Sequence, residues 1–246
     1  MESIENFKKR VDSLINKALQ GNVVLTNFLD EAESIIFKDM VSKNKDIIMN
    51  YSGNIKNSLR NRYILSIYDN VDLDFKINLY KIEYNKKYYE LNHRNILGSL
   101  MSLGIKRECI GDIVIDDFKK AYFAITKEIS PYILEEFRFV GNTPIELKIE
   151  ENEIENVIKY NSKDFFTSSF RLDTIVALGF NLSRSEAQEY IIDELVSINH
   201  ILTKNTSHLV KLNDFIQVRH KGTILLAHIG NQSKSGKTFI TIKKKV

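Results

Sequence analysis

The sequence contains one cysteine, Cys109, among 246 residues. A single thiol excludes an internal disulfide and every zinc or iron–sulfur site that needs several cysteines, and it suits a reducing compartment. Tryptophan is absent and there are two prolines, so turns depend on Gly, Asn, Asp and Ser. No apolar run approaches the roughly 18 residues of a membrane span. We therefore expect a cytoplasmic protein with no membrane span, no metal and no cofactor.

The net charge of +3 is small but unevenly distributed. From Ile201 onward there are nine Lys or Arg residues and one acid, Asp214, a net charge of +8, which leaves −5 for the first 200 residues. Concentrated positive charge attracts polyanions and steers their approach. The charge pattern therefore favours nucleic-acid binding by the C-terminal end, with a basic but solvated β-surface as the alternative.

Hydrophobic periodicity predicts an α+β protein. Helices are expected at 4–20 and 27–43, in a segment ending at 59–62, and at 93–103, 130–137, 171–178 and 184–193. Strands are expected at 47–51, 63–68, 75–84, 112–115, 121–125, 139–140 and 145–149. The polar stretches 150–153 and 161–164 suggest a domain boundary near 155–165. Strands and helices that alternate over about 90 residues indicate a ferredoxin-like or RRM-like sheet domain.

The segment from Ser233 to Thr238 looks like the end of a phosphate-binding P-loop. That motif needs four residues between its first Gly and the Gly-Lys pair, but five separate Gly230 from Gly236, and a strand-like sequence follows. We expect a loop between two antiparallel strands instead. The five histidines are not spaced as a helical zinc pair, and no Gly-x-Ser-x-Gly elbow occurs. The residues therefore predict no enzyme of these classes.

Two arginines lie at the starts of neighbouring predicted helices. Ser183 and Glu186 have the spacing of a capping box, which places Arg184 in the first turn of the second helix. Arg171 likewise lies in the first turn of the first helix. The helix macrodipole disfavours a cation there, yet helix N-termini bind phosphate and Arg adds a bidentate fork. Phosphate binding is the favoured interpretation, with local pairing such as Arg171 to Asp173 as the alternative. On this view Arg184→Glu leaves the fold intact.

These residues resemble the S4 domain of ribosomal protein S4 and several RNA-modifying enzymes. The matching pattern runs from Arg171-Leu172-Asp173 through 182–187 to 210–219, about the last third of the chain. Two departures are Glu194 and Asn213, which stand where the family usually has glycine. The resemblance implies an S4 (αL-type) RNA-binding domain at 163–246, whose candidate RNA-binding residues are Arg171, Asp173, Ser183, Arg184, Gln188, Lys211, Arg219 and Lys221.

The rest of the chain is similar to the YlmH-like proteins of bacteria, most specifically over 97–113, which ends in Cys109-Ile110-Gly111-Asp112-Ile113. The implied organisation is an N-terminal helical α+β region at 1–65, a ferredoxin-like domain at 66–160 and the S4 domain. Lys106 and Arg107 are candidates for a second RNA contact, or else belong to an ordinary solvated loop.

The resemblance implies a non-enzymatic, monomeric factor that binds RNA, namely rRNA with tRNA as a further candidate, on the large ribosomal subunit. Its expected role is ribosome-associated quality control of stalled nascent chains. Two alternatives stay open. One is an RNA-modifying enzyme like the pseudouridine synthases, and the other is a protein-interaction module associated with cell division.

Overall fold

The computed structural model describes residues 4–157, 159–199 and 201–245, and it divides into two compact units, Met1–Val157 and Ile158–Val246. Both units combine helices with antiparallel sheets, so the predicted α+β class is confirmed. None of the helices within the described ranges is long and apolar enough to cross a membrane.

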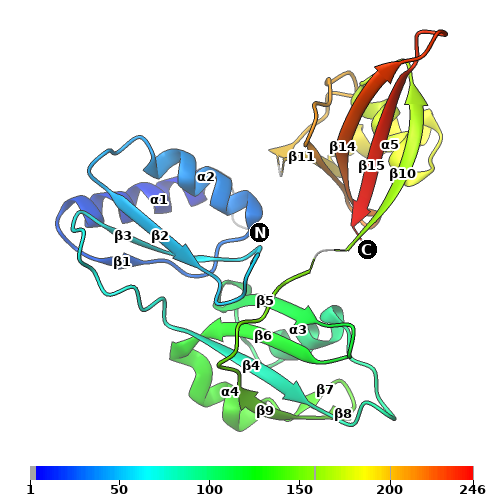
Figure 1. Cartoon of the computed structure of the whole chain (residues 1–246). Coiled ribbons are helices and arrows are strands. Elements are labelled where there is room, and N and C mark those ends of the chain that lie inside the picture. Colours follow the sequence, from blue (N-terminus) through cyan, green and yellow to red (C-terminus); the bar gives the residue numbers. More distant parts are fainter. Residues whose placement is uncertain (1–3, 158, 200, 246) are drawn as a thin grey trace. The chain divides into compact units, whose positions relative to one another are not determined.

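The first unit begins with a three-stranded sheet in the order β1-β3-β2, and two helices pack against it (Figure 1). Phe37, Tyr63 and Leu65 are fully buried in the core between helices and sheet. The second helix begins at Glu31, four residues later than predicted, because the Asp30 carboxylate caps it by accepting a hydrogen bond from the Glu33 N–H at 2.9 Å. The elements are α1 (Ile4–Leu19), β1 (Val24–Leu25), α2 (Glu31–Val41), β2 (Ile48–Ser52) and β3 (Arg62–Ser66).

No helix forms at 53–61, so the helix predicted to end at 59–62 is wrong. Asn54 and Asn57 adopt positive φ there, which interrupts any helical turn. The N–H groups of Leu59 and Arg60 instead donate to the Asp112 carboxylate at 2.7 and 3.0 Å. A partner more than fifty positions away in the chain therefore overrides the local pattern.

The remainder of this unit has the ferredoxin-like strand order β5-β6-β4-β9, with every neighbouring pair antiparallel. Helices α3 and α4 cover one face, where Ile96, Leu100 and Ile133 pack against Tyr80 and Phe123. The elements are β4 (Ile77–Glu83), α3 (His93–Ser102), η1 (Arg107–Cys109), β5 (Ile110–Ile115), β6 (Ala121–Thr126), η2 (Lys127–Ile129), α4 (Ser130–Glu136), β7 (Phe139–Val140), β8 (Thr143–Pro144) and β9 (Glu146–Ile149).

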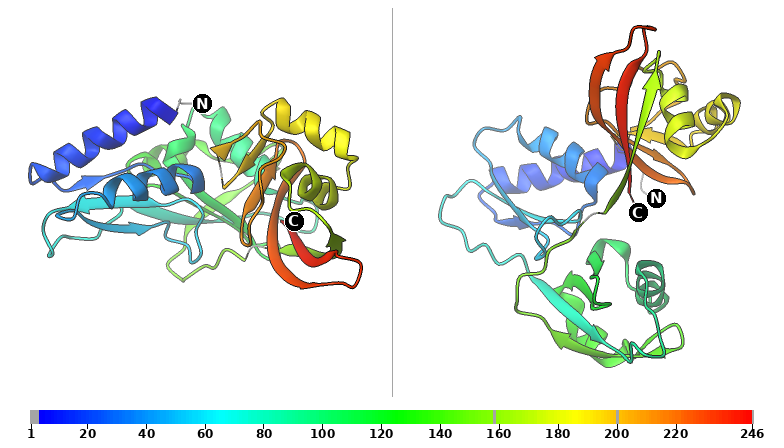
Figure 2. Two further views of the ribbon diagram at one scale, coloured as in Figure 1. Left: turned by 90° about the horizontal axis from the view of Figure 1, so that it is seen from above. Right: turned by 45° about the vertical axis from the view of Figure 1, so that its right-hand side comes forward.

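The second unit is a six-stranded antiparallel sheet in the order β10-β15-β14-β13-β11-β12, with two helices on one face (Figure 2). Residues 161–164, predicted as a polar break, pair with β15 and are part of a strand. The P-loop-like segment is a loop between two strands, as predicted. The elements are β10 (Tyr160–Thr167), α5 (Leu172–Phe180), α6 (Arg184–Ile192), β11 (Val196–Ile198), β12 (Ile201–Leu202), β13 (Phe215–Val218), β14 (Gly222–Gln232) and β15 (Thr238–Lys245).

Glu194 and Asn213 both have positive φ, 57° and 68°, at turns where the S4 family usually has glycine. This backbone conformation strains Glu much more than Asn. We expect Glu194→Gly to raise the free energy of unfolding of the second unit by about 0.5–1 kcal/mol, because glycine adopts positive φ without this strain. The exposed ion pair between Glu194 and Lys204, which the variant loses, contributes little. Asn213→Gly is the matched control and should change stability less. Urea denaturation tests this, and an unchanged or less stable Glu194→Gly would contradict it.

Candidate nucleic-acid interface

A buried carboxylate joins the starts of α5 and α6. Asp173, in the first turn of α5, has a side chain with no solvent exposure. Its Oδ2 accepts hydrogen bonds from Arg171 Nη2 at 2.9 Å, Arg184 Nη2 at 3.1 Å and Gln188 Nε2 at 2.8 Å. Four of the predicted RNA-binding residues therefore meet at one point, which we call the Asp173 cluster: Arg171, Asp173, Arg184 and Gln188.

The cluster keeps Asp173 ionised. Burial, the largest single effect, would raise the pKa of this carboxyl, but the hydrogen bonds from Arg171, Gln188 and Arg184 together outweigh it. The pKa of Asp173 is consequently held well below its usual range. With two arginines against one carboxylate, the cluster carries a net charge of +1.

Both arginines are fixed on one side and exposed on the other. Arg184 and Arg171 use Nε and Nη2 to bind Asp173, and their side chains are 57% and 33% exposed. The local pairing raised as the alternative for Arg171 is thus present, and it leaves Nη1 of each guanidinium without a hydrogen-bond partner in the described part of the chain. A carboxylate that holds one edge of each guanidinium limits the rotamer freedom of the side chain and fixes the direction of its other edge, whose N–H groups have the geometry that a phosphate group can accept.

Ser183 stabilises the helix start that carries Arg184. Its hydroxyl accepts from the Glu186 N–H at 3.2 Å, and the Glu186 carboxylate accepts from the Ser183 N–H at 2.7 Å, which is the predicted capping box. The backbone hydrogen bond to Ser183 lowers the pKa of Glu186. The Ser183 hydroxyl is therefore engaged within the protein, and its effect on the site is to fix the direction of the first turn of α6.

The remaining predicted basic residues of the second unit are exposed and belong to other segments. Lys221, just before β14, places its Nζ 5.7 Å from the centre of the Tyr190 ring on α6. Lys211 lies in the loop before β13, where its N–H donates to Asp214 at 2.7 Å, and Arg219 follows β13. Within the described ranges no hydrogen bond or ion pair connects the side chains of Lys211 or Arg219 to the Asp173 cluster.

In the first unit the structure separates the two members of the predicted second contact. Lys106 is exposed. Arg107 points inward, and its Nη1 donates to the carbonyls of Ile110 at 2.6 Å and Gly111 at 3.3 Å. Burial, followed by repulsion from Arg60, lowers the pKa of Arg107 to about 10. The hydrogen-bonding capacity of Arg107 is thus largely used inside the fold.

The sheet face that RRM domains use for RNA is covered here by the chain itself. RRM domains stack bases on aromatic residues of this face, but Leu79, Val114 and Tyr122 are buried beneath Phe28 and Ile55 of the N-terminal region. A Cβ on Gly111 would lie 2.8 Å from the Phe28 ring, so the contact is close and a larger residue would disturb it. Arg60 and Asp112 tie the same two regions together. The sequence pattern alone does not reveal this interface, because its partners are far apart in the chain.

Comparisons with known proteins agree with this architecture. Residues 71–156 match the family described as "Putative RNA-binding domain in YlmH", and residues 170–216 match the S4 domain. The chain is 26% identical over 252 residues to "Ribosome-associated protein quality control protein P2" of Bacillus subtilis (strain 168), covering 98% of this chain and 97% of that protein.

A solved structure is also similar. "Cell division protein ylmH from Streptococcus pneumoniae" shares 26% sequence identity with a TM-score of 0.50, covering 61% of this chain and 93% of that one. The matched domain families are RNA-binding families and not enzyme families. With one segment that matches the YlmH RNA-binding domain, another that matches the S4 domain and a relative that aligns over almost the full length, the chain resembles the YlmH-like proteins and has an S4 domain near its C-terminal end.

Proposed function

We propose that this protein binds rRNA on the large ribosomal subunit through its S4 domain and acts there in quality control of stalled nascent chains. It would do so as a monomer in the cytoplasm, where ribosomes work, and without catalysis. The observation that carries the proposal is the Asp173 cluster, in which one buried carboxylate orients two arginines at helix starts, Arg184 exposed and Arg171 partly exposed. The ribosomal role is supported by the name of the Bacillus subtilis relative.

The proposed RNA-binding domain is 163–246, where positive charge is concentrated, and its contacts are of two kinds. Arg171 and Arg184 bind phosphate directly, and Lys211, Arg219 and Lys221 add positive charge around them. Asp173, Gln188 and Ser183 act on RNA through the arginines that they position. Lys106 is the exposed member of the proposed second contact, since Arg107 is turned inward.

Co-sedimentation of the full-length protein with purified large and small ribosomal subunits, over a series of salt concentrations, tests the proposal. We expect co-migration with the large subunit that weakens steeply as salt rises, because each neutralised phosphate releases counterions. Equal binding to both subunits, or binding independent of salt, would contradict it. Conversion of uridine to pseudouridine in the bound RNA would favour the enzyme alternative. A protein that binds neither subunit nor any RNA would favour a protein-interaction module.

A further inference from the structure

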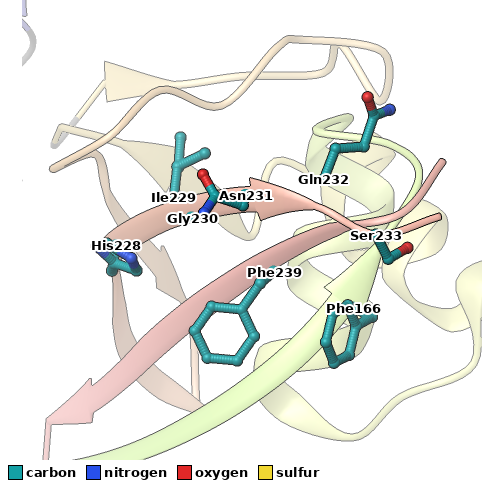
Figure 3. Close-up of a pocket in the computed structure, with 8 residues that line it drawn as sticks. All are labelled: Phe166, His228, Ile229, Gly230, Asn231, Gln232, Ser233 and Phe239. Carbon is teal, nitrogen blue, oxygen red and sulfur yellow. The ribbon is translucent and has the colours of Figure 1, made fainter.

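Three aromatic rings lie on adjacent strands of the second unit (Figure 3). Phe166 of β10 and Phe239 of β15 have ring centroids 5.5 Å apart, and His228 of β14 lies 6.2 Å from Phe239. Phe166 is 59% exposed, so most of its side chain is accessible to solvent. We call the surface formed by Phe166, His228 and Phe239 the ring face.

The ring face is opposite the hydrophobic core. Successive side chains of a strand point to opposite sides of a sheet, and Ile240 and Ile242 of β15 are buried under α5 and α6. Phe239 therefore lies on the other side, and none of the three rings belongs to that core. The buried residues hold the strands in place, so the rings are presented by a stable sheet.

An open hollow of about 620 Å³ adjoins the rings, and Asn231, Gln232 and Ser233 also line it. A Cβ on Gly230 would lie 3.1 Å from Phe239 Cδ1 and 3.2 Å from His228 Nε2, so glycine keeps this space clear. The hollow thus combines a flat apolar surface with amide and hydroxyl groups. A planar ring that has polar atoms at its edge could stack on the first and form hydrogen bonds with the second.

The surroundings of the ring face are basic. Lys234 and Lys237 are exposed in the loop between β14 and β15, and alternation along β15 puts Lys243 on the same side of the sheet as Phe239. Asp164, an acid on this side, accepts a hydrogen bond from Thr241 Oγ1 at 2.7 Å. Positive charge next to exposed rings fits a polyanion that carries planar groups.

We propose that the ring face binds unpaired bases of RNA by stacking. Proteins that bind single-stranded RNA combine a basic surface with aromatic side chains on which bases stack. The inference rests on the proposed function and extends it, because the ring face lies outside both the 71–156 and 170–216 matches and on the sheet face away from α5 and α6. The S4 unit would then contact phosphates through the Asp173 cluster and bases through the ring face.

Two RNA probes separate stacking from phosphate binding: a single-stranded oligoadenylate of twelve nucleotides and a blunt, fully paired RNA duplex. We expect Phe166→Ala and Phe239→Ala in the full-length protein each to weaken oligoadenylate binding about 5- to 150-fold, the usual loss for one stacked base. Duplex binding should be unchanged. Phe139→Ala, which removes a ring 57% exposed in the first unit, is the matched control and should alter neither.

The absence of tryptophan allows a direct readout in a folded protein. In Phe166→Trp the only indole of the protein lies on the ring face. Oligoadenylate should quench the fluorescence of this indole and should bind the variant with near-parental affinity. The duplex should leave the fluorescence unchanged. An unquenched indole, or alanine variants that bind oligoadenylate like the parent, would overturn the ring-face proposal while ribosome binding by the parent stands. A parent that binds neither ribosomal subunits nor either probe would overturn the proposed function as well.

Discussion

Replacing Arg184 by glutamine should weaken RNA binding about 10- to 100-fold without unfolding the protein. The variant cannot form the charge-assisted hydrogen bond with phosphate, worth about 1.5–3 kcal/mol, while the new side-chain amide can still donate to Asp173. The logarithm of affinity should also fall less steeply with the logarithm of salt concentration, by about 0.7–0.9 for the one phosphate that is no longer neutralised. Affinity for large subunits across a salt series, with the unfolding midpoint of each variant, provides the measurement.

Arg94→Gln is the matched control, because Arg94 is an exposed arginine of α3 in the first unit. Arg171→Gln should act in the same direction as Arg184→Gln, and the double variant should be less than additive, since both arginines share Asp173 as a partner. If Arg184→Gln bound large subunits as tightly as Arg94→Gln, Arg184 would not contact RNA and would act only as an ion-pair partner of Asp173.

The structure corrects the expectation that Arg184→Glu leaves the fold intact. That expectation considered only the helix macrodipole, which favours an acid in the first turn. In the folded protein, Arg184 Nη2 lies 3.1 Å from the carboxylate of Asp173. A glutamate there would bring a second negative charge toward a buried one, so the variant should lose stability as well as affinity. Glutamine is therefore the more informative substitution.

Sequence predicted best those features whose causes are local. The Ser183–Glu186 capping box and the ten-residue alternation that became β4 depend on neighbouring residues, and both are present. Features that depend on distant partners were missed. The segment before β3 looks helical in the sequence, but the N–H groups of Leu59 and Arg60 donate to Asp112, more than fifty positions away. Glu194 and Asn213, which stand where S4-like sequences usually have glycine, both adopt positive φ, the conformation that glycine adopts most easily.

The candidate site shows the same division. Spacing alone placed both arginines in the first turns of helices. Arg184 is indeed the first residue of α6, and Arg171 is the N-cap residue directly before α5. It did not show that a single carboxylate joins the two helices, because Asp173 and Gln188 are fifteen positions apart and meet only after α5 and α6 pack. Asp173 was predicted to bind RNA, whereas its side chain has no exposed surface. We therefore expect any effect of Asp173 on RNA binding to act through the arginines that it holds.

Replacing Asp173 by asparagine should be the most destabilising of the substitutions considered. Four hydrogen bonds end on Oδ2 of this buried carboxylate, from Arg171, Arg184 and Gln188. An asparagine amide there carries no negative charge. Depending on its orientation, it presents to these donors either its NH2 group, which cannot accept a hydrogen bond, or its carbonyl oxygen, which is a weaker acceptor than a carboxylate. We expect the free energy of unfolding at pH 7 to fall by about 2–4 kcal/mol, since hydrogen bonds to charged groups contribute about 1.5–3 kcal/mol each and are partly replaced.

The pH dependence distinguishes this electrostatic role from simple packing. The pKa of Asp173 is lower in the folded than in the unfolded chain, where it is about 3.9, so the folded state binds the proton less readily. The stabilisation is therefore complete above about pH 5 and is lost as pH falls below about 4 toward the folded-state pKa. The difference between parent and Asp173→Asn should be constant from pH 6 to 8 and should shrink in acid.

Urea denaturation of the parent and Asp173→Asn at a series of pH values tests this, with Asp193→Asn, an exposed acid of the same unit, as the control. A difference that persists unchanged at pH 3 would mean that Asp173 contributes through shape and not through charge. RNA affinity at pH 7, measured where Asp173→Asn is still folded, gives the second readout. Because the two guanidiniums lose the acceptor that orients them, affinity should fall even though no residue that contacts phosphate has been changed. If the folded variant bound RNA as tightly as the parent, RNA binding by the two arginines would not depend on Asp173.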